Sequence, residues 1–166
     1  MRATVVFFTR TGRSEQVAQA LVREFGERGV DVELVRLEPA RGTSLAGGAF
    51  LAALRIPAPL EQTPDLSGVD LLALVGPVWA GSMTPAMRSM IEAMPDLGGR
   101  PVVNVVCGFH RCSGVAARMK QELQARDARV VASRAIGRSV LKDPHVVNEL
   151  ARELSAAALG PERRLC

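Results

Sequence analysis

A short segment near the start of the chain combines hydroxyl, glycine and arginine residues: Thr9, Arg10, Thr11, Gly12, Arg13 and Ser14. It lies between an apolar run and a helix-like pattern, which predicts a turn from a strand into a helix. Free amides at a helix start and short hydroxyl donors suit a phosphate group. The alternative to phosphate binding is an ordinary capped turn, in which the Ser14 hydroxyl accepts hydrogen bonds from the first helical amides. The Walker and G-x-G-x-x-G patterns are absent here, which disfavours a nucleotide triphosphatase and a dinucleotide-first Rossmann domain.

A second segment holds the only tryptophan of the chain, and we predict it as a loop: Pro77, Val78, Trp79, Ala80, Gly81 and Ser82. The indole offers a flat face for stacking, or it simply covers the edge of a sheet. Gly81 would let the backbone approach a planar ligand closely, or adopt a positive φ in a turn.

A third segment is rich in glycine and carries an aromatic residue and a histidine: Gly108, Phe109, His110, Arg111, Cys112, Ser113 and Gly114. Two cysteines, Cys107 and Cys112, have a C-x4-C spacing that is neither a redox C-x-x-C nor part of a zinc site. We interpret Cys107 as a buried residue at a strand end and Cys112 as oxidisable if it is exposed. The second histidine, His145, is predicted at the surface.

Strand and helix patterns alternate along the chain and predict how these segments are positioned. Apolar strands are expected over residues 3–8, 30–37, 70–76, 101–107 and 128–136, and helices from Ser14, Leu45, Thr84, Ser113 and Asp143. Thr84-Pro85 and Asp143-Pro144 combine a capping side chain with a proline at the first helical position. Methionines at helical spacing between 87 and 94 are interpreted as core. The alternation predicts a three-layer, doubly wound α/β fold with a five-stranded parallel sheet.

Ligands of such sheets bind outside the carboxyl ends of the strands, where the strand order reverses. The three segments follow the first, third and fourth predicted strands, so we expect them to converge at one edge of the sheet. Their sequences, T-x-T-G-x-S, P-V-W-A-G-S and a Gly-rich loop, resemble the three FMN-binding loops of the flavodoxin family. The resemblance spans essentially the whole chain and implies the sheet order 2-1-3-4-5, with FMN bound non-covalently.

By position, the resemblance also implies roles for individual residues. The phosphate would be wrapped by Thr9, Thr11, Gly12, Arg13 and Ser14; the ring system would stack on Trp79, lie near Ala80–Gly81 and be flanked by Gly108, Phe109 and His110; Arg10, Pro77, Val78 and Ser113 complete the predicted cofactor-binding set. A protonated His110 would stabilise reduced flavin or donate a proton to a quinone. An exposed loop histidine without a role is the alternative.

Three features depart from the classical flavodoxin pattern. The chain has no tyrosine to flank the flavin, so Phe109 or His110 must substitute or leave one face open. Its isoelectric point is near 9.6, whereas classical carriers are strongly acidic. Arg13 stands where a neutral polar residue is common in the family.

Length and composition favour one soluble domain over residues 1–160, followed by a loose tail at 161–166. The 166 residues are 48% hydrophobic and carry a net charge of +4, which excludes a disordered chain or a fibre. Three cysteines in a chain of this size indicate a reducing, cytoplasmic compartment. We expect no signal peptide, membrane span or metal site. The arginines between Arg100 and Lys142 are scattered over several elements, and so we expect no nucleic acid partner.

Two redox functions fit this pattern. The first is electron transfer through bound FMN to and from a partner protein, as a short domain would do. The second is an FMN oxidoreductase that takes hydride from NAD(P)H and reduces a quinone or similar acceptor. In that case the irregular segment 42–59 would cover the ring or form a homodimer contact. A non-redox α/β binding domain is more remote, and a receiver domain would need carboxylates where Thr9 and Pro77 stand.

Overall fold

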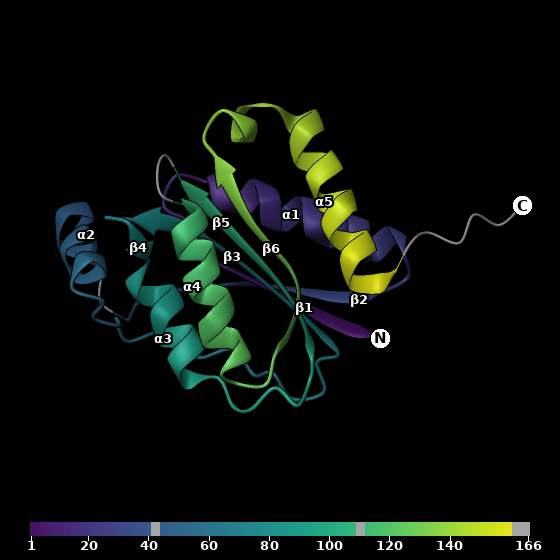
Figure 1. Ribbon diagram of the computed structural model, residues 1–166, viewed down its shortest axis with the longest axis horizontal. Helices are drawn as coiled ribbons and strands as arrows, with labels where there is room; N and C mark the ends of the chain where they lie inside the picture. The colour runs from purple at the N-terminus through teal and green to yellow at the C-terminus, as the bar shows by residue number, and fades with distance from the viewer. Residues whose placement is uncertain (41–43, 109–111, 161–166) are drawn as a thin grey trace, which may run out of the picture.

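Strands and helices alternate in the computed structural model, which describes residues 1–40, 44–108 and 112–160 (Figure 1). The elements are β1 (Arg2–Phe7), α1 (Arg13–Glu27), β2 (Asp31–Arg36), α2 (Leu45–Ala53), β3 (Leu71–Trp79), β4 (Ser82–Met83), α3 (Pro85–Ala93), β5 (Pro101–Gly108), α4 (Cys112–Gln124), β6 (Arg129–Gly137), the 3-10 turn η1 (Val140–Lys142) and α5 (Pro144–Leu159). Each predicted strand and helix is present, within a few residues of its expected ends.

The sheet has the order β2-β1-β3-β5-β6, and all four of these pairings are parallel. The predicted order 2-1-3-4-5 is therefore confirmed for the five parallel strands. The strand β4 was not predicted, and it pairs antiparallel with the end of β3. Strand order reverses between β1 and β3, which places the switch point beside the turn that starts α1.

Helices cover both faces of the sheet, with α1 and α5 on one side and α3 and α4 on the other (Figure 1). Each face has its own buried apolar cluster, and residues 71–75 of β3 are fully buried between them, as is typical of a central parallel strand. The methionines predicted as core, Met87, Met90 and Met94, are buried. In the part of the chain that the structure describes, no helix is both long and apolar enough to cross a membrane.

The predicted caps are present. The hydroxyl of Thr84 accepts a hydrogen bond from the Met87 amide at 3.4 Å, and the Asp143 carboxylate accepts one from the His145 amide at 2.9 Å. Each cap satisfies an amide that has no partner within its own helix. Helices α3 and α5 thus start where their proline allows them to start.

The prediction that residues 77–82 form a loop was wrong. Strand β3 continues through Pro77 to Trp79, and Val78 and Trp79 pair with Met83 and Ser82 of β4. Pro77 is tolerated in the strand because the pairing of β3 with β1 ends at Val75, so its missing amide hydrogen breaks no bond on that side. The tryptophan therefore stands on a paired β-hairpin.

Candidate functional site

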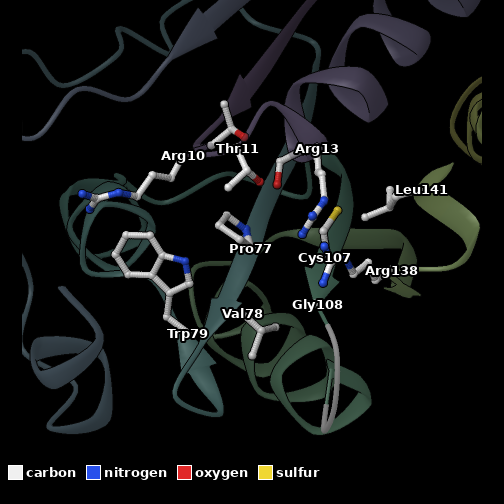
Figure 2. A pocket seen from close by; sticks show the side chains of 12 residues that line it. Arg10, Thr11, Arg13, Pro77, Val78, Trp79, Cys107, Gly108, Arg138 and Leu141 are labelled. Carbon is white, nitrogen blue, oxygen red and sulfur yellow. The ribbon is translucent and has the colours of Figure 1, made fainter. Parts of the chain in front are cut away.

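A cavity of about 370 Å³ opens at the carboxyl edge of the sheet (Figure 2), within the range of roughly 300–1,000 Å³ typical of small-ligand sites. All three predicted segments contribute to its walls. It is lined by Thr9, Arg10, Thr11, Arg13, Ser14, Pro77, Val78, Trp79, Cys107, Gly108, Arg138 and Leu141. The expected convergence of segments from the ends of β1, β3 and β5 is therefore present in the structure.

The turn between β1 and α1 forms one wall. Gly12 is the N-cap of α1 and has a φ of 79°, a left-handed conformation that favours glycine. Glycine has no side chain to cap the helix, and Ser14 lies within the first turn, so the capped-turn interpretation of Ser14 does not hold. Thr9 and Ser14 are buried polar side chains that face the cavity. Amides and hydroxyls here are arranged as donors for an anion.

The indole of Trp79 forms the opposite wall and packs against two neighbours. Its ring lies edge-on to Phe8, with a centroid distance of 5.5 Å and an interplanar angle of 74°. Helix α2 also approaches so closely that a Cβ atom on Gly48 would lie 2.5 Å from Cζ3 of the indole. A larger side chain at position 48 requires the indole or α2 to shift. Packing therefore fixes the orientation of the aromatic wall.

The hairpin beyond Trp79 turns through Ala80 and Gly81, which have φ angles of 47° and 72°. Two positive φ angles are the signature of tight two-residue hairpins, and the alternative that Gly81 takes a positive φ is confirmed. Both residues are exposed and lie outside the cavity lining. Below the hairpin, the buried Arg88 donates a hydrogen bond from its guanidinium to the Ser82 hydroxyl at 3.4 Å.

The floor of the cavity is made by the end of β5. A Cβ on Gly108 would lie 2.7 Å from Sγ of Cys112 and 3.0 Å from Cβ of Val78, so glycine lets β5, β3 and α4 meet here. Cys107 is buried, as predicted, and this burial raises the pKa of its thiol to about 12, against a hydrogen bond with Ser14 that lowers it. Cys112 is also buried, and its pKa is raised by burial. Neither thiol is poised as a nucleophile at neutral pH.

The structure adds two lining residues that the sequence did not indicate, Arg138 and Leu141, which follow β6. The predicted fifth strand could have indicated them, because β6 is parallel to β5 and its carboxyl end reaches the same edge of the sheet. Of the predicted site residues, Gly12, Ala80, Gly81 and Ser113 are outside the lining set, and Phe109 and His110 lie outside the described residues. The other nine predicted residues line the cavity.

Three of the twelve lining residues are arginines, Arg10, Arg13 and Arg138, and none of the twelve is acidic. The cavity therefore favours a ligand with negative charge. Arg13 and Arg138 lie on the side away from Trp79, whereas Arg10 extends near the indole (Figure 2). A molecule with an anionic group at one end and a flat aromatic system at the other fits this arrangement.

The doubly wound sheet, with its cavity beside the β1/β3 switch point, defines a flavodoxin-like protein. The sequence profile of the NADPH-dependent FMN reductase family matches residues 8–141, so the chain belongs to this family. It is a redox protein whose cofactor is FMN. No curated protein matches the sequence.

Solved flavodoxins share the fold at low sequence identity. Oxidised flavodoxin 1 from Bacillus cereus is similar with a TM-score of 0.68 and 15% identity, over 96% of this chain and 97% of that one. Reduced Megasphaera elsdenii flavodoxin gives 0.63 and 18%, over 92% and 98% of the two chains. A Streptococcus pneumoniae flavodoxin gives 0.61 and 16%, over 94% and 99%.

Proposed function

We propose that this protein is an NAD(P)H-dependent FMN oxidoreductase that delivers electrons to a quinone or a similar acceptor. The observation that carries the proposal is the match to the NADPH-dependent FMN reductase family, which begins at Phe8 and contains all three cavity segments. The arginines around the cavity support it, because a nicotinamide cosubstrate brings further phosphate groups to the same entrance.

Within this proposal, different residues of the cavity bind the phosphate and the ring system of FMN. The hydroxyls of Thr9, Thr11 and Ser14 and the amides at the start of α1 hold the phosphate of FMN. Trp79 stacks against the ring system and excludes water from one of its faces. Bound FMN supplies the two-electron chemistry, which the protein tunes through such contacts.

A carrier that exchanges electrons with a partner protein is the second candidate, and the surface of α2 favours it. Phe50 on this helix and Leu54 at its C-cap are 63% and 54% exposed, and Gly48 of the same helix approaches the indole of Trp79. An apolar patch next to the cavity would bring a partner close to the ring system. The same patch would serve a homodimer.

The visible spectrum of the FMN-loaded protein, recorded without oxygen, separates the two candidates. For the oxidoreductase we expect rapid bleaching of the flavin absorbance by NADPH or NADH, with the colour restored by a quinone. A flavin that is bleached by dithionite but by neither nucleotide would overturn the enzyme and leave the carrier. Trp79→Ala gives a matched variant, in which bleaching should slow because the ring system is no longer held.

The compartment and the third segment complete the proposal. The two cysteines in the described part of the chain, Cys107 and Cys112, are not joined in a disulfide, which supports a reducing cytoplasm. The role of His110 as a proton donor to a quinone stays a prediction. With His110 as the donor, His110→Gln should slow reoxidation by a quinone and remove the part of its pH dependence that follows the imidazole.

A further inference from the structure

A buried arginine lies beside the hairpin that carries Trp79. The side chain of Arg88, in α3, is 9% exposed. Its Nη2 donates a hydrogen bond to the hydroxyl of Ser82 at 3.4 Å, and its Nη1 lies 3.8 Å from Oε1 of Glu122 in α4. Its Nε is buried and has no hydrogen-bond partner in the part of the chain that the structure describes. The guanidinium thus connects α3 with β4 and α4.

A charged side chain is not needed to fill this space. Taking a guanidinium out of water is unfavourable, and a well-packed apolar side chain of similar volume is often at least as stabilising as a buried ion pair. On this face of the sheet, α3 and α4 contribute to one apolar cluster through Met87, Ile91, Met119 and Leu123. Because an apolar residue at position 88 would extend that cluster, stability alone does not account for the arginine. What an arginine adds is a fixed geometry between its partners.

The partner of Arg88 in β4 belongs to a hairpin that needs support. The hairpin has two residue pairs, Val78 with Met83 and Trp79 with Ser82, and two short paired strands are marginally stable by themselves. Its turn begins at residue 80 with a φ of 47°, a left-handed conformation that is unfavourable for a residue with a Cβ atom. Strand β4 lies beside α2 and α4 (Figure 1). Contacts with these helices therefore add to the weak pairing of the hairpin.

One residue separates Arg88 from the aromatic wall of the cavity. Ser82 is paired with Trp79, so a contact that fixes Ser82 also fixes the backbone from which the indole projects. Arg88 is not among the residues that line the cavity, and it acts on this wall through Ser82. Packing against Gly48 orients the indole ring, whereas the hydrogen bond to Ser82 places the hairpin that carries the ring.

We propose that Arg88 is a positioning residue of the flavin site, which locks the hairpin of residues 79–82 onto α3 and α4 and so holds Trp79 where the ring system binds. The inference rests on the FMN site of the proposed function and adds to it a residue that does not touch the cofactor. Glu122 orients the guanidinium from α4, and Ser82 transmits its position to the hairpin.

The test separates positioning from stability by means of methionine, which fills the space of Arg88 without its charge. Arg88→Met should unfold in urea at the wild-type midpoint or above it, because the remaining side chain of Glu122 is 29% exposed and water can solvate it. In the apoprotein the variant should shift the emission maximum of Trp79. It should weaken the binding of FMN and of riboflavin by the same factor, roughly threefold to tenfold, the value of one aromatic contact. The losses are equal because both ligands share the ring system.

Three further variants test the route through Ser82. Ser82→Ala removes the acceptor and should weaken flavin binding as much as Arg88→Met, and the double variant should lose no more than either single variant. Arg88→Lys keeps the charge but not the fork, and it should recover part of the binding. Arg100→Met is the matched control. Arg100 is a half-buried arginine that donates a hydrogen bond to the carbonyl of Leu66, and it precedes β5 at the edge of the sheet away from the cavity. Its flavin binding should equal that of wild type.

Two results would overturn the positioning role. The first is unchanged flavin binding and unchanged Trp79 emission in Arg88→Met. The second is a loss of flavin binding together with a urea midpoint well below that of wild type, because Arg88 would then be an ordinary structural support. Bleaching of bound FMN by NAD(P)H tests the proposed function separately. If wild type is not bleached but the variants bind flavin as expected, the positioning role stands and the oxidoreductase proposal falls.

Discussion

Gly48 on α2 is the position where one methyl group should disturb the aromatic wall of the site. A Cβ atom there would lie 2.5, 3.2 and 3.4 Å from three carbons of the Trp79 indole. Carbon atoms in contact are normally about 3.5–4.0 Å apart, so Gly48→Ala must move the indole or α2 by about 1 Å. Because the indole also packs edge-on against Phe8, a shift of this size changes the contact between the two rings as well.

Two effects of Gly48→Ala on the free energy of unfolding oppose each other, and their sum decides whether the variant is more or less stable than wild type. Replacing glycine by alanine in a helix interior stabilises by about 0.8–1.0 kcal/mol, whereas overpacking costs about 1–3 kcal/mol. Gly26→Ala in α1 supplies the control, because a Cβ at Gly26 meets nothing within 4 Å. We expect Gly26→Ala to raise the free energy of unfolding, and Gly48→Ala to lie about 1–3 kcal/mol below it.

Trp79 is the only tryptophan, so the intrinsic fluorescence of the apoprotein reports directly on this ring. Gly48→Ala should shift the emission maximum and weaken FMN binding by up to about tenfold, the value of one aromatic stacking contact. Gly26→Ala should change neither. An unchanged emission spectrum and FMN dissociation constant in Gly48→Ala would show that α2 does not hold the indole, and the reasoning from the close approach would be refuted.

Three further perturbations test the cavity and its supports. Ser14→Ala should weaken FMN binding measured by fluorescence quenching by roughly tenfold, whereas Ser113→Ala, outside the lining set, should not. Arg88→Ala removes a buried guanidinium that contacts Ser82 and lies 3.8 Å from Glu122, and it should lower the free energy of unfolding in urea by about 1–3 kcal/mol; no change would exclude Arg88 as a support. Since Cys107 has a pKa raised from 9.0 to about 12, the folded protein keeps this proton while the unfolded chain loses it. Stability should therefore fall as the pH rises from 9 towards 12, and thiol reagents at pH 8 should label Cys107 only after unfolding.

The alternation of strands and helices and the place of the cavity were predictable because they depend on long apolar runs and on chain topology, whereas the sheet order was implied by the resemblance to the flavodoxin family. Residues 3–8, 70–76 and 101–107 are nearly continuous apolar runs, each with a single polar residue, and such runs form parallel strands buried on both faces. Once the strands alternate with helices, the carboxyl ends of all parallel strands lie at one edge. The caps at Thr84 and Asp143 were predictable for another reason, since a side chain that bonds an amide two or three residues away needs no tertiary information.

The parts that the sequence did not indicate depend on neighbours that are distant in the chain. Pro77 predicts a strand end by itself, and it is compatible with β3 only because β1 stops pairing at Val75. In the sequence, Arg138 is one of many arginines expected at the surface. Only the register of β6 with β5 and the burial of Leu141 place it at the cavity. Nothing in the sequence marks Gly48 as a packing position either, because the residue that a side chain there would meet is Trp79, which belongs to another element.

The two ends of the cavity therefore depend on different interactions, packing at one end and charge at the other, and their salt dependence tells them apart. The indole of Trp79 is fixed by packing against Phe8 and Gly48, and packing depends weakly on salt. Arg13 and Arg138 line the other end of the cavity and would act on a bound anion through charge, and interactions between partly exposed charges are screened over about 8–10 Å at physiological salt. Raising the salt concentration should weaken FMN binding and leave riboflavin binding nearly unchanged. Because Arg138→Gln removes one of the charges, the salt dependence of FMN binding should be smaller in that variant than in wild type.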